Sequence, residues 1–308
     1  MANLKNIKQK IQSYRKTGTV THAMEAVSAI KMRKSQMRAL SGRAYAAAAL
    51  SVLERISGTA DAARHPMMQE REGMPLFIVI TSDKGLAGSF NSGVIRVAEK
   101  KLGEFNFSNK TAGVLVAIGR RGGDYFASRG YDILLRRENI RDDVLESDMR
   151  DITDEIVKRY DSRDIGSVYV IYQNFISTFE QEPVVKQIVP IRPEMMREMV
   201  AGIRPAKGKY APQDLRGETA RVPAAYTIEP DPDTVLSELL PKLLNIAVFH
   251  ALIEAKASEH SARMVAMKNA TDKAKEMAHN LTRTFNKVRQ AAITREVSEI
   301  TSGIEAMK

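Results

Sequence analysis

The chain has 308 residues, of which 44% are hydrophobic and 27% are charged, and its formal net charge is +10. These proportions are those of a folded, water-soluble protein and exclude a disordered chain. Cysteine is absent, which excludes disulfides and cysteine metal sites and fits a reducing cytoplasm. No apolar run approaches the roughly 20 residues that cross a bilayer, so we expect no membrane span and no signal peptide.

The positive charge is concentrated at the N-terminus. Residues 1–57 hold eleven Lys and Arg against two acids, Glu25 and Glu54, which gives this segment a net charge of +9. Such a bias predicts an acidic partner, which could be a nucleic acid, an anionic lipid or an acidic protein surface. Composition does not decide among the three.

Residues 1–58 are predicted to form one long helix, because apolar residues recur at helical spacing and proline is absent. The spacing slips between Tyr14 and Val20, where Gly18 costs about 1 kcal/mol of helix propensity. Gly58 is the expected end of the helix. The expected apolar stripe consists of Leu4, Ile7, Ile11, Tyr14, Val20, Met24, Val27, Met37, Leu40, Ala44 and Ala47.

Residues 74–192 alternate between strand-like and helix-like runs, which predicts a Rossmann-like α/β domain with a mostly parallel sheet. Residues 193–230 are rich in Pro, Gly and charge and are predicted to be an irregular connection. The expected strands are 76–81, 111–118, 133–135, 168–173 and 184–189, and the expected helices are 91–102, 122–128 and 146–160.

Residues 231–305 are predicted to form a second long helix, which begins with Asp231 as N-cap and Pro232 in the first turn. Alternate steps of four and three from Leu239 to Ala292 visit sixteen positions, of which thirteen are apolar. A 3.5-residue repeat of this length indicates a coiled coil. The fold class is therefore α/β plus long helices, in which the terminal helices form an antiparallel coiled coil. The alternative is that each helix pairs with a second chain.

Motifs for chemistry are weak. The strand–turn–helix segment 81–91 could place a phosphate on a helix N-terminus, as could Gly119, Gly122 and Gly123, but both lack the glycine spacing of known phosphate loops. His250 and His260 fall on the coiled-coil seam, ten residues apart, where they cannot share a metal. We therefore expect no catalytic residue, no cofactor and no metal.

The segment 31–38 carries four basic residues on a helix. A basic helical face favours nucleic-acid binding. No aromatic residue is interleaved and no DNA-binding motif is present, so a solvated face or a docking face for an acidic protein is at least as good an interpretation.

Several of these segments together resemble the gamma subunit of F-type ATP synthases, over nearly the whole chain. The resemblance is carried by residues 23–27 and 31–36 in the first helix, by the turn at 81–91, and by 229–232 at the start of the last helix. It is most specific at Ser258-Glu259-His260-Ser261-Ala262-Arg263-Met264-Val265-Ala266-Met267 and at residues 286–296.

The resemblance implies a central rotor shaft that couples proton-driven rotation to ATP synthesis in a ring of alpha and beta subunits. It implies further contacts with the epsilon subunit and the membrane rotor ring, no nucleic acid, and a peripheral position on the cytoplasmic face of a bacterial cell membrane. An acidic region of the beta subunits would match the +9 segment. The implied contacts with partner subunits are Met24, Lys31, Arg33, Lys34, Lys84, Gly85, Arg263, Arg289 and Gln290.

Overall fold

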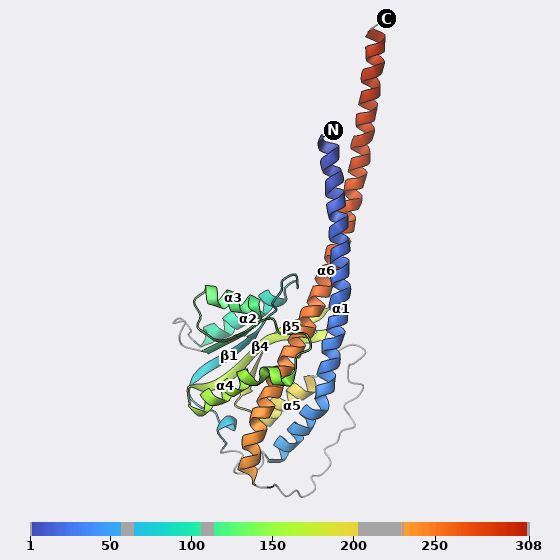
Figure 1. The fold of residues 1–308 in the computed structure, drawn as a ribbon. Helices are drawn as coiled ribbons and strands as arrows, with labels where there is room; N and C mark the ends of the chain where they lie inside the picture. Colours follow the sequence, from blue (N-terminus) through green and yellow to red (C-terminus); the bar gives the residue numbers. More distant parts are fainter. Residues whose placement is uncertain (1, 57–64, 106–113, 203–228, 230, 307–308) are drawn as a thin grey trace. The chain divides into compact units, whose positions relative to one another are not determined.

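The computed structural model describes residues 2–56, 65–105, 114–202, 229 and 231–306 (Figure 1). Its residues fall into two compact units: a central unit of residues 29–262, and a coiled-coil unit of residues 1–28 and 263–308. Two long helices contribute to both units, namely α1 (Ala2–Ile56) and α6 (Pro232–Ala306). The expected helix end at Gly58 lies outside the described residues.

The start of α6 has the predicted cap. The Asp231 carboxylate accepts hydrogen bonds from the backbone N–H of Thr234 at 2.8 Å and from its hydroxyl at 2.7 Å. Pro232 is the first helical residue, where its missing N–H costs nothing. Pro241 lies inside the helix without ending it.

The central unit contains a five-stranded sheet in the order β3-β2-β1-β4-β5. Strand β1 pairs in parallel with β2 and β4, and β2 pairs in parallel with β3, whereas β4 and β5 form an antiparallel hairpin. The predicted mostly parallel sheet is confirmed. The strands are β1 (Met74–Ile80), β2 (Val114–Ile118), β3 (Ile133–Arg137), β4 (Ile165–Ser177) and β5 (Glu180–Val189).

Helices cover both faces of the sheet (Figure 1). Phe77 and Val79 of β1 pack in a core with α2 (Phe90–Glu104) and α3 (Arg120–Ser128). The alternate residues Leu76, Ile78 and Ile80 pack in a larger core with α4 (Arg150–Asp161), α6 and the end of α1. Burial on both faces explains why β1 is a continuous apolar run.

Two predicted segments differ from the structure. The helix expected over 146–160 is divided into a 3-10 turn, η3 (Glu146–Met149), followed by α4. The connection expected to be irregular from residue 193 begins as a helix, α5 (Pro193–Gly202), with Pro193 in the first turn and Met196 buried in the larger core. Proline suits that position, so its presence is no evidence against a helix. The rest of the predicted connection lies outside the described residues, except for Glu229. A second 3-10 turn, η2 (Pro66–Met68), precedes β1.

One helix of the described chain is long and apolar enough to cross a membrane by length and composition alone. It is α6, where an 18-residue window reaches a mean hydropathy of 1.4. However, 67% of that window is buried inside the protein. Packing against the sheet accounts for the apolar character of this helix.

Candidate partner-contact surface

The coiled-coil unit is built on the seam predicted for α6. The seam residues Met264, Met267, Thr271, Ala274 and Ala278 are buried or half-buried, whereas the residues between Thr271 and Ala274 and between Ala274 and Met277 are exposed. The repeat continues in half-buried positions to Ala292. The 3.5-residue repeat predicted for this helix therefore coincides with its buried and half-buried positions.

The seam of α1 differs from the predicted stripe. Val20, Val27 and Met37 are 58%, 52% and 56% exposed. The buried line continues without a slip from Ile11 and Tyr14, and its members are Gly18, Thr21, Ser28, Met32 and Ser35. Apart from Met32, these residues are small, and at Gly18 and Thr21 the small side chains allow the two helices to approach closely.

Two pairs of residues show this close approach within the coiled-coil unit. The hydroxyls of Thr21 and Thr271 form a buried hydrogen bond of 2.6 Å. A Cβ added to Gly18 would lie 3.6 Å from the Cβ of Ala274. Because higher numbers in α1 face lower numbers in α6, the two helices are antiparallel. The predicted antiparallel coiled coil is confirmed.

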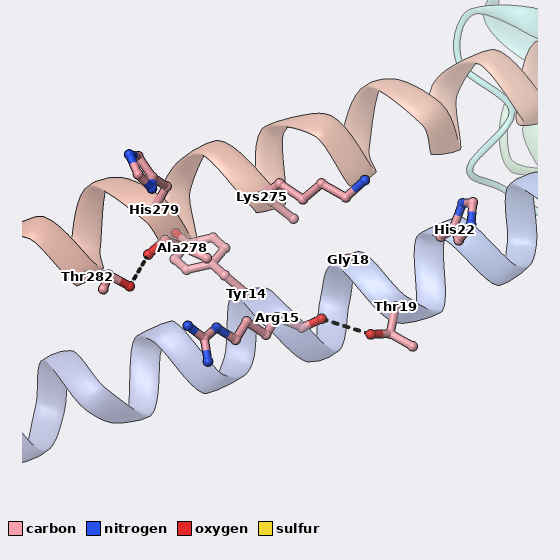
Figure 2. A pocket seen from close by; sticks show the side chains of 10 residues that line it. Tyr14, Arg15, Gly18, Thr19, His22, Lys275, Ala278, His279 and Thr282 are labelled. Atoms are coloured by element: carbon pink, nitrogen blue, oxygen red, sulfur yellow. Dashed lines mark hydrogen bonds between the residues drawn. The ribbon is translucent and has the colours of Figure 1, made fainter.

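A groove of about 540 Å³ runs beside this part of the seam. Figure 2 shows Tyr14 reaching from α1 towards Ala278 of α6, with Lys275 and His279 on α6 and Arg15 and His22 on α1 around it. The groove exists because Gly18, Ala274 and Ala278 leave little side-chain volume between the helices. Its remaining lining residues are Thr19 and Thr282.

Apolar side chains remain on the outside of both long helices. The outer line of α1 consists of Val20, Val27, Ile30 and Met37, each more than half exposed, at spacings of seven, three and seven residues. The last turns of α6 expose Ile293, Val297, Ile300 and Ile304 in the same way. Exposed apolar residues in such rows mark interaction surfaces.

The glycine turns of the central unit have a structural role. Gly119 has a φ of +95°, and an added Cβ would lie 2.1 Å from the carbonyl oxygen of Thr81. At the start of α3, the N–H groups of Arg121 and Gly122 already donate to the Ser82 carbonyl and the Thr81 hydroxyl, at 3.1 and 2.8 Å. Bonds within the protein therefore occupy these donors of the suspected phosphate site.

A cluster of titratable groups is buried between α6 and β4. The Tyr172 hydroxyl donates to Glu254 at 2.6 Å, and burial together with this carboxylate raises the pKa of Tyr172 well above its usual value. His250 Nδ1 lies 3.8 Å from Glu254, and burial lowers the pKa of His250. Among the described residues, no three His, Asp or Glu side chains come together as a metal site.

Comparison with known proteins decides the family. The family described as ATP synthase matches residues 3–307. The chain is 36% identical to the ATP synthase gamma chain of Pelotomaculum thermopropionicum over 309 residues, which cover 100% of both chains. It is 35% identical to the gamma chain of Chloroherpeton thalassium, over 100% of this chain and 99% of that one. This chain belongs to the ATP synthase gamma chain family.

Solved structures with the same fold as this gamma-family chain come from mitochondrial ATP synthases. A chain of the Euglena gracilis enzyme has a TM-score of 0.63 at 15% identity, with 99% of this chain and 95% of that chain covered. A chain from the central stalk and c-ring of the Tetrahymena thermophila enzyme has a TM-score of 0.59 at 23% identity, with coverage of 82% and 99%. None of these relatives supports the nucleic-acid alternative.

The residues expected to contact partners are spread over both units. In the coiled-coil unit, Met24 is half-buried, Arg263 is 8% exposed, and Arg289 and Gln290 are exposed. The central unit holds the other five: Arg33, Lys34 and Lys84 are exposed, and Lys31 and Gly85 are half-buried.

Lys31 has a partner within the chain, since its Nζ lies 2.7 Å from Asp142 Oδ2. Asp142 lies in the loop between β3 and η3 and was not predicted to be a functional residue. No local motif marks it, because its partners come from helices far away in the sequence.

Proposed function

We propose that this chain is the central rotor shaft of an F-type ATP synthase, which couples proton-driven rotation to conformational changes in the catalytic ring. The observation that carries the proposal is the 36% identity to an ATP synthase gamma chain over the full length of both chains. The length of α1 and α6 and their antiparallel seam fit a rod that carries torque.

The outer surface of the two helices supports the proposal. The outer line of α1 places apolar side chains next to the exposed Arg33 and Lys34, in a segment with a net charge of +9. An acidic and partly apolar lever on the beta subunits would complement this face. A contact that forms in only one orientation of the shaft shifts the nucleotide state of one beta subunit by its differential free energy.

The proposed partners are the alpha and beta subunits of the ring, the epsilon subunit and the membrane rotor ring, at the cytoplasmic face of a bacterial membrane. The chain is proposed to bind there peripherally, without a membrane span and without nucleic acid. ATP chemistry belongs to the ring, and this chain contributes no catalytic residue. The proposed contacts are Met24, Lys31, Arg33, Lys34, Lys84 and Gly85 towards the beta levers, and Arg263, Arg289 and Gln290 elsewhere on the shaft.

The test of the proposal is purification of the complex through an affinity tag on this chain, from its native membranes. We expect alpha, beta and epsilon subunits in a complex that hydrolyses ATP, and ATP-driven rotation of a bead attached to the chain. A preparation that contains nucleic acid, or that lacks ring subunits, would contradict the proposal.

The contact residues are tested by the double variant Arg289→Ala/Gln290→Ala in that complex. Both residues are exposed, so we expect the fold to persist while ATP turnover or coupling falls severalfold. The control is Lys273→Ala/Glu276→Ala, which removes an exposed ion pair from the same helix. Equal rates of hydrolysis and synthesis in the two variants would remove Arg289 and Gln290 from the proposed contacts.

A further inference from the structure

One carboxylate of the central unit is surrounded by three basic side chains from two helices. Asp142 accepts from Lys31 of α1 at 2.7 Å, and His260 Nε2 of α6 lies 2.9 Å from its other oxygen. Lys256 Nζ of α6 lies 3.7 Å from that same oxygen. The loop after β3 is thereby connected to both long helices.

This cluster is partly protected from water, and its most exposed member is the Lys31 side chain, at 43%. The side chains of His260 and Lys256 are 5% and 10% exposed, and that of Asp142 is 34% exposed. Lys256 Nζ also donates to the carbonyl of Ile140 in the same loop at 2.8 Å. The His260 hydrogen bond and the neighbouring Lys31 hold the pKa of Asp142 well below its usual range. The carboxylate is therefore ionised at neutral pH.

The cluster lies where both helices pass from the central unit into the coiled-coil unit. The central unit begins at residue 29 and ends at residue 262, so Lys31 and His260 are each within one helical turn of a boundary. Both crossings of the chain between the two units fall at these turns. Side chains that bind these turns of α1 and α6 to the rest of the central unit limit how far the two helices can twist there.

The two helices are fastened unequally at this level. Helix α6 has further hydrogen bonds, since Ser258 donates to the carbonyl of Gln173 in β4 at 2.9 Å. Among the described side chains of α1 residues 29–45, one forms an ion pair with the rest of the central unit. This pair is Lys31–Asp142. Apolar contacts accompany it: Met32 packs with Phe175 and Ala257, and Ala39 packs against the larger core. Apolar contact is non-directional, whereas charge-assisted hydrogen bonds fix geometry.

We propose that Asp142 is a positioning residue that holds α1 and α6 to the loop after β3. In this role it raises the torsional stiffness of the connection between the sheet and the two long helices. This role rests on the proposed function as a rotor. Asp142 acts through Lys31, Lys256 and His260 and touches no substrate. Its removal leaves three basic groups facing one another, so the loop and α1 separate while the rest of the central core stays packed.

The test compares Asp142→Asn with Asp143→Asn in the purified complex. Asp143 is the adjacent residue, 68% exposed and paired with Arg141, so its variant loses the same charge outside the cluster. Torsional stiffness is measured from the angular fluctuation of a bead on the stalled shaft. We expect at least a twofold loss of stiffness and of protons pumped per ATP in Asp142→Asn. Hydrolysis without load should change less than twofold, and Asp143→Asn should match the parent.

A chemical cross-link separates the positioning role from a general loss of stability. The chain has no cysteine, so Lys31→Cys/Asp142→Cys can be joined specifically by a short bifunctional thiol reagent. The uncross-linked double variant should show the reduced stiffness, and cross-linking should restore it. Stiffness that is equal in Asp142→Asn and Asp143→Asn, or that cross-linking leaves low, would overturn the proposal.

Hydrogen exchange on the full isolated chain distinguishes failure of this inference from failure of the proposed function. We expect the amides of residues 29–35 to exchange at least fivefold faster in Asp142→Asn than in Asp143→Asn. Equal exchange would overturn the fastening role even in a chain that assembles normally. Failure of the parent chain to assemble with a ring would overturn the rotor function, and the torque role with it.

Discussion

Replacement of Gly18 by alanine should stabilise the coiled-coil unit. Gly18 is buried on the α1 seam, where the backbone is helical. An added Cβ would lie 3.6 Å from Ala274 Cβ, which is an ordinary van der Waals contact, so the methyl group fits without a shift of the partner helix. Glycine inside a helix costs about 1 kcal/mol relative to alanine.

The expected gain is the sum of two effects. Helix propensity contributes about 1 kcal/mol, and partial burial of one methyl group adds up to about 0.8 kcal/mol. The control is Gly42→Ala in the same helix, where no atom lies within 4 Å of an added Cβ, so that only the propensity contributes. The difference between the two variants therefore measures packing at the seam.

Hydrogen exchange is the suitable assay, because it reports local opening. A gain of about 1 kcal/mol corresponds to roughly fivefold slower exchange of the amides within one turn of Gly42, and a gain of about 1.8 kcal/mol to roughly twentyfold slower exchange around Gly18. Exchange around Gly18→Ala that is no slower than in the parent would refute the packing of Gly18 against Ala274.

Three further changes test other contacts. Gly119→Ala should leave the chain largely insoluble on expression, because the new Cβ would lie 2.1 Å from the Thr81 carbonyl at a positive φ; a soluble yield equal to the parent would contradict this. Thr21→Val should cost about 1 kcal/mol in urea unfolding, because it removes the buried hydrogen bond to Thr271 and leaves that hydroxyl with only its bond to the Met267 carbonyl. If the two hydroxyls interact, the loss in the double variant with Thr271→Val should be smaller than the sum of the two single losses; additive losses would refute the pairing. The pKa of His250 is lowered by burial, so the unfolded state binds the proton first and this residue destabilises the fold as the pH falls below 6.5. Urea midpoints of His250→Leu should therefore fall less with decreasing pH than those of the parent, and parallel falls would contradict the argument.

The elements of the central unit were largely predictable from sequence, because their determinants are local. Strand β1 is buried on both faces, and its sequence is accordingly a continuous apolar run. The start of α6 is recognisable because Asp231 caps the helix by bonding to Thr234, only three residues away. The helix α5 was missed because its Pro and charge content is also typical of loops, and what identifies it is the burial of Met196 against the core.

Local patterns were enough to predict the long helices, the mostly parallel sheet, the period of the α6 seam and, through long motifs, the resemblance to gamma subunits. Which face of α1 is buried became clear from the packing of the folded chain. A row of apolar residues predicts a buried face when the face is buried because it is apolar. Gly18 and Thr21 lie on the buried face of α1 for another reason, because small side chains fit where α6 approaches closely. Likewise, Asp142 acquires its role from residues more than a hundred positions away, and no local pattern encodes such a meeting.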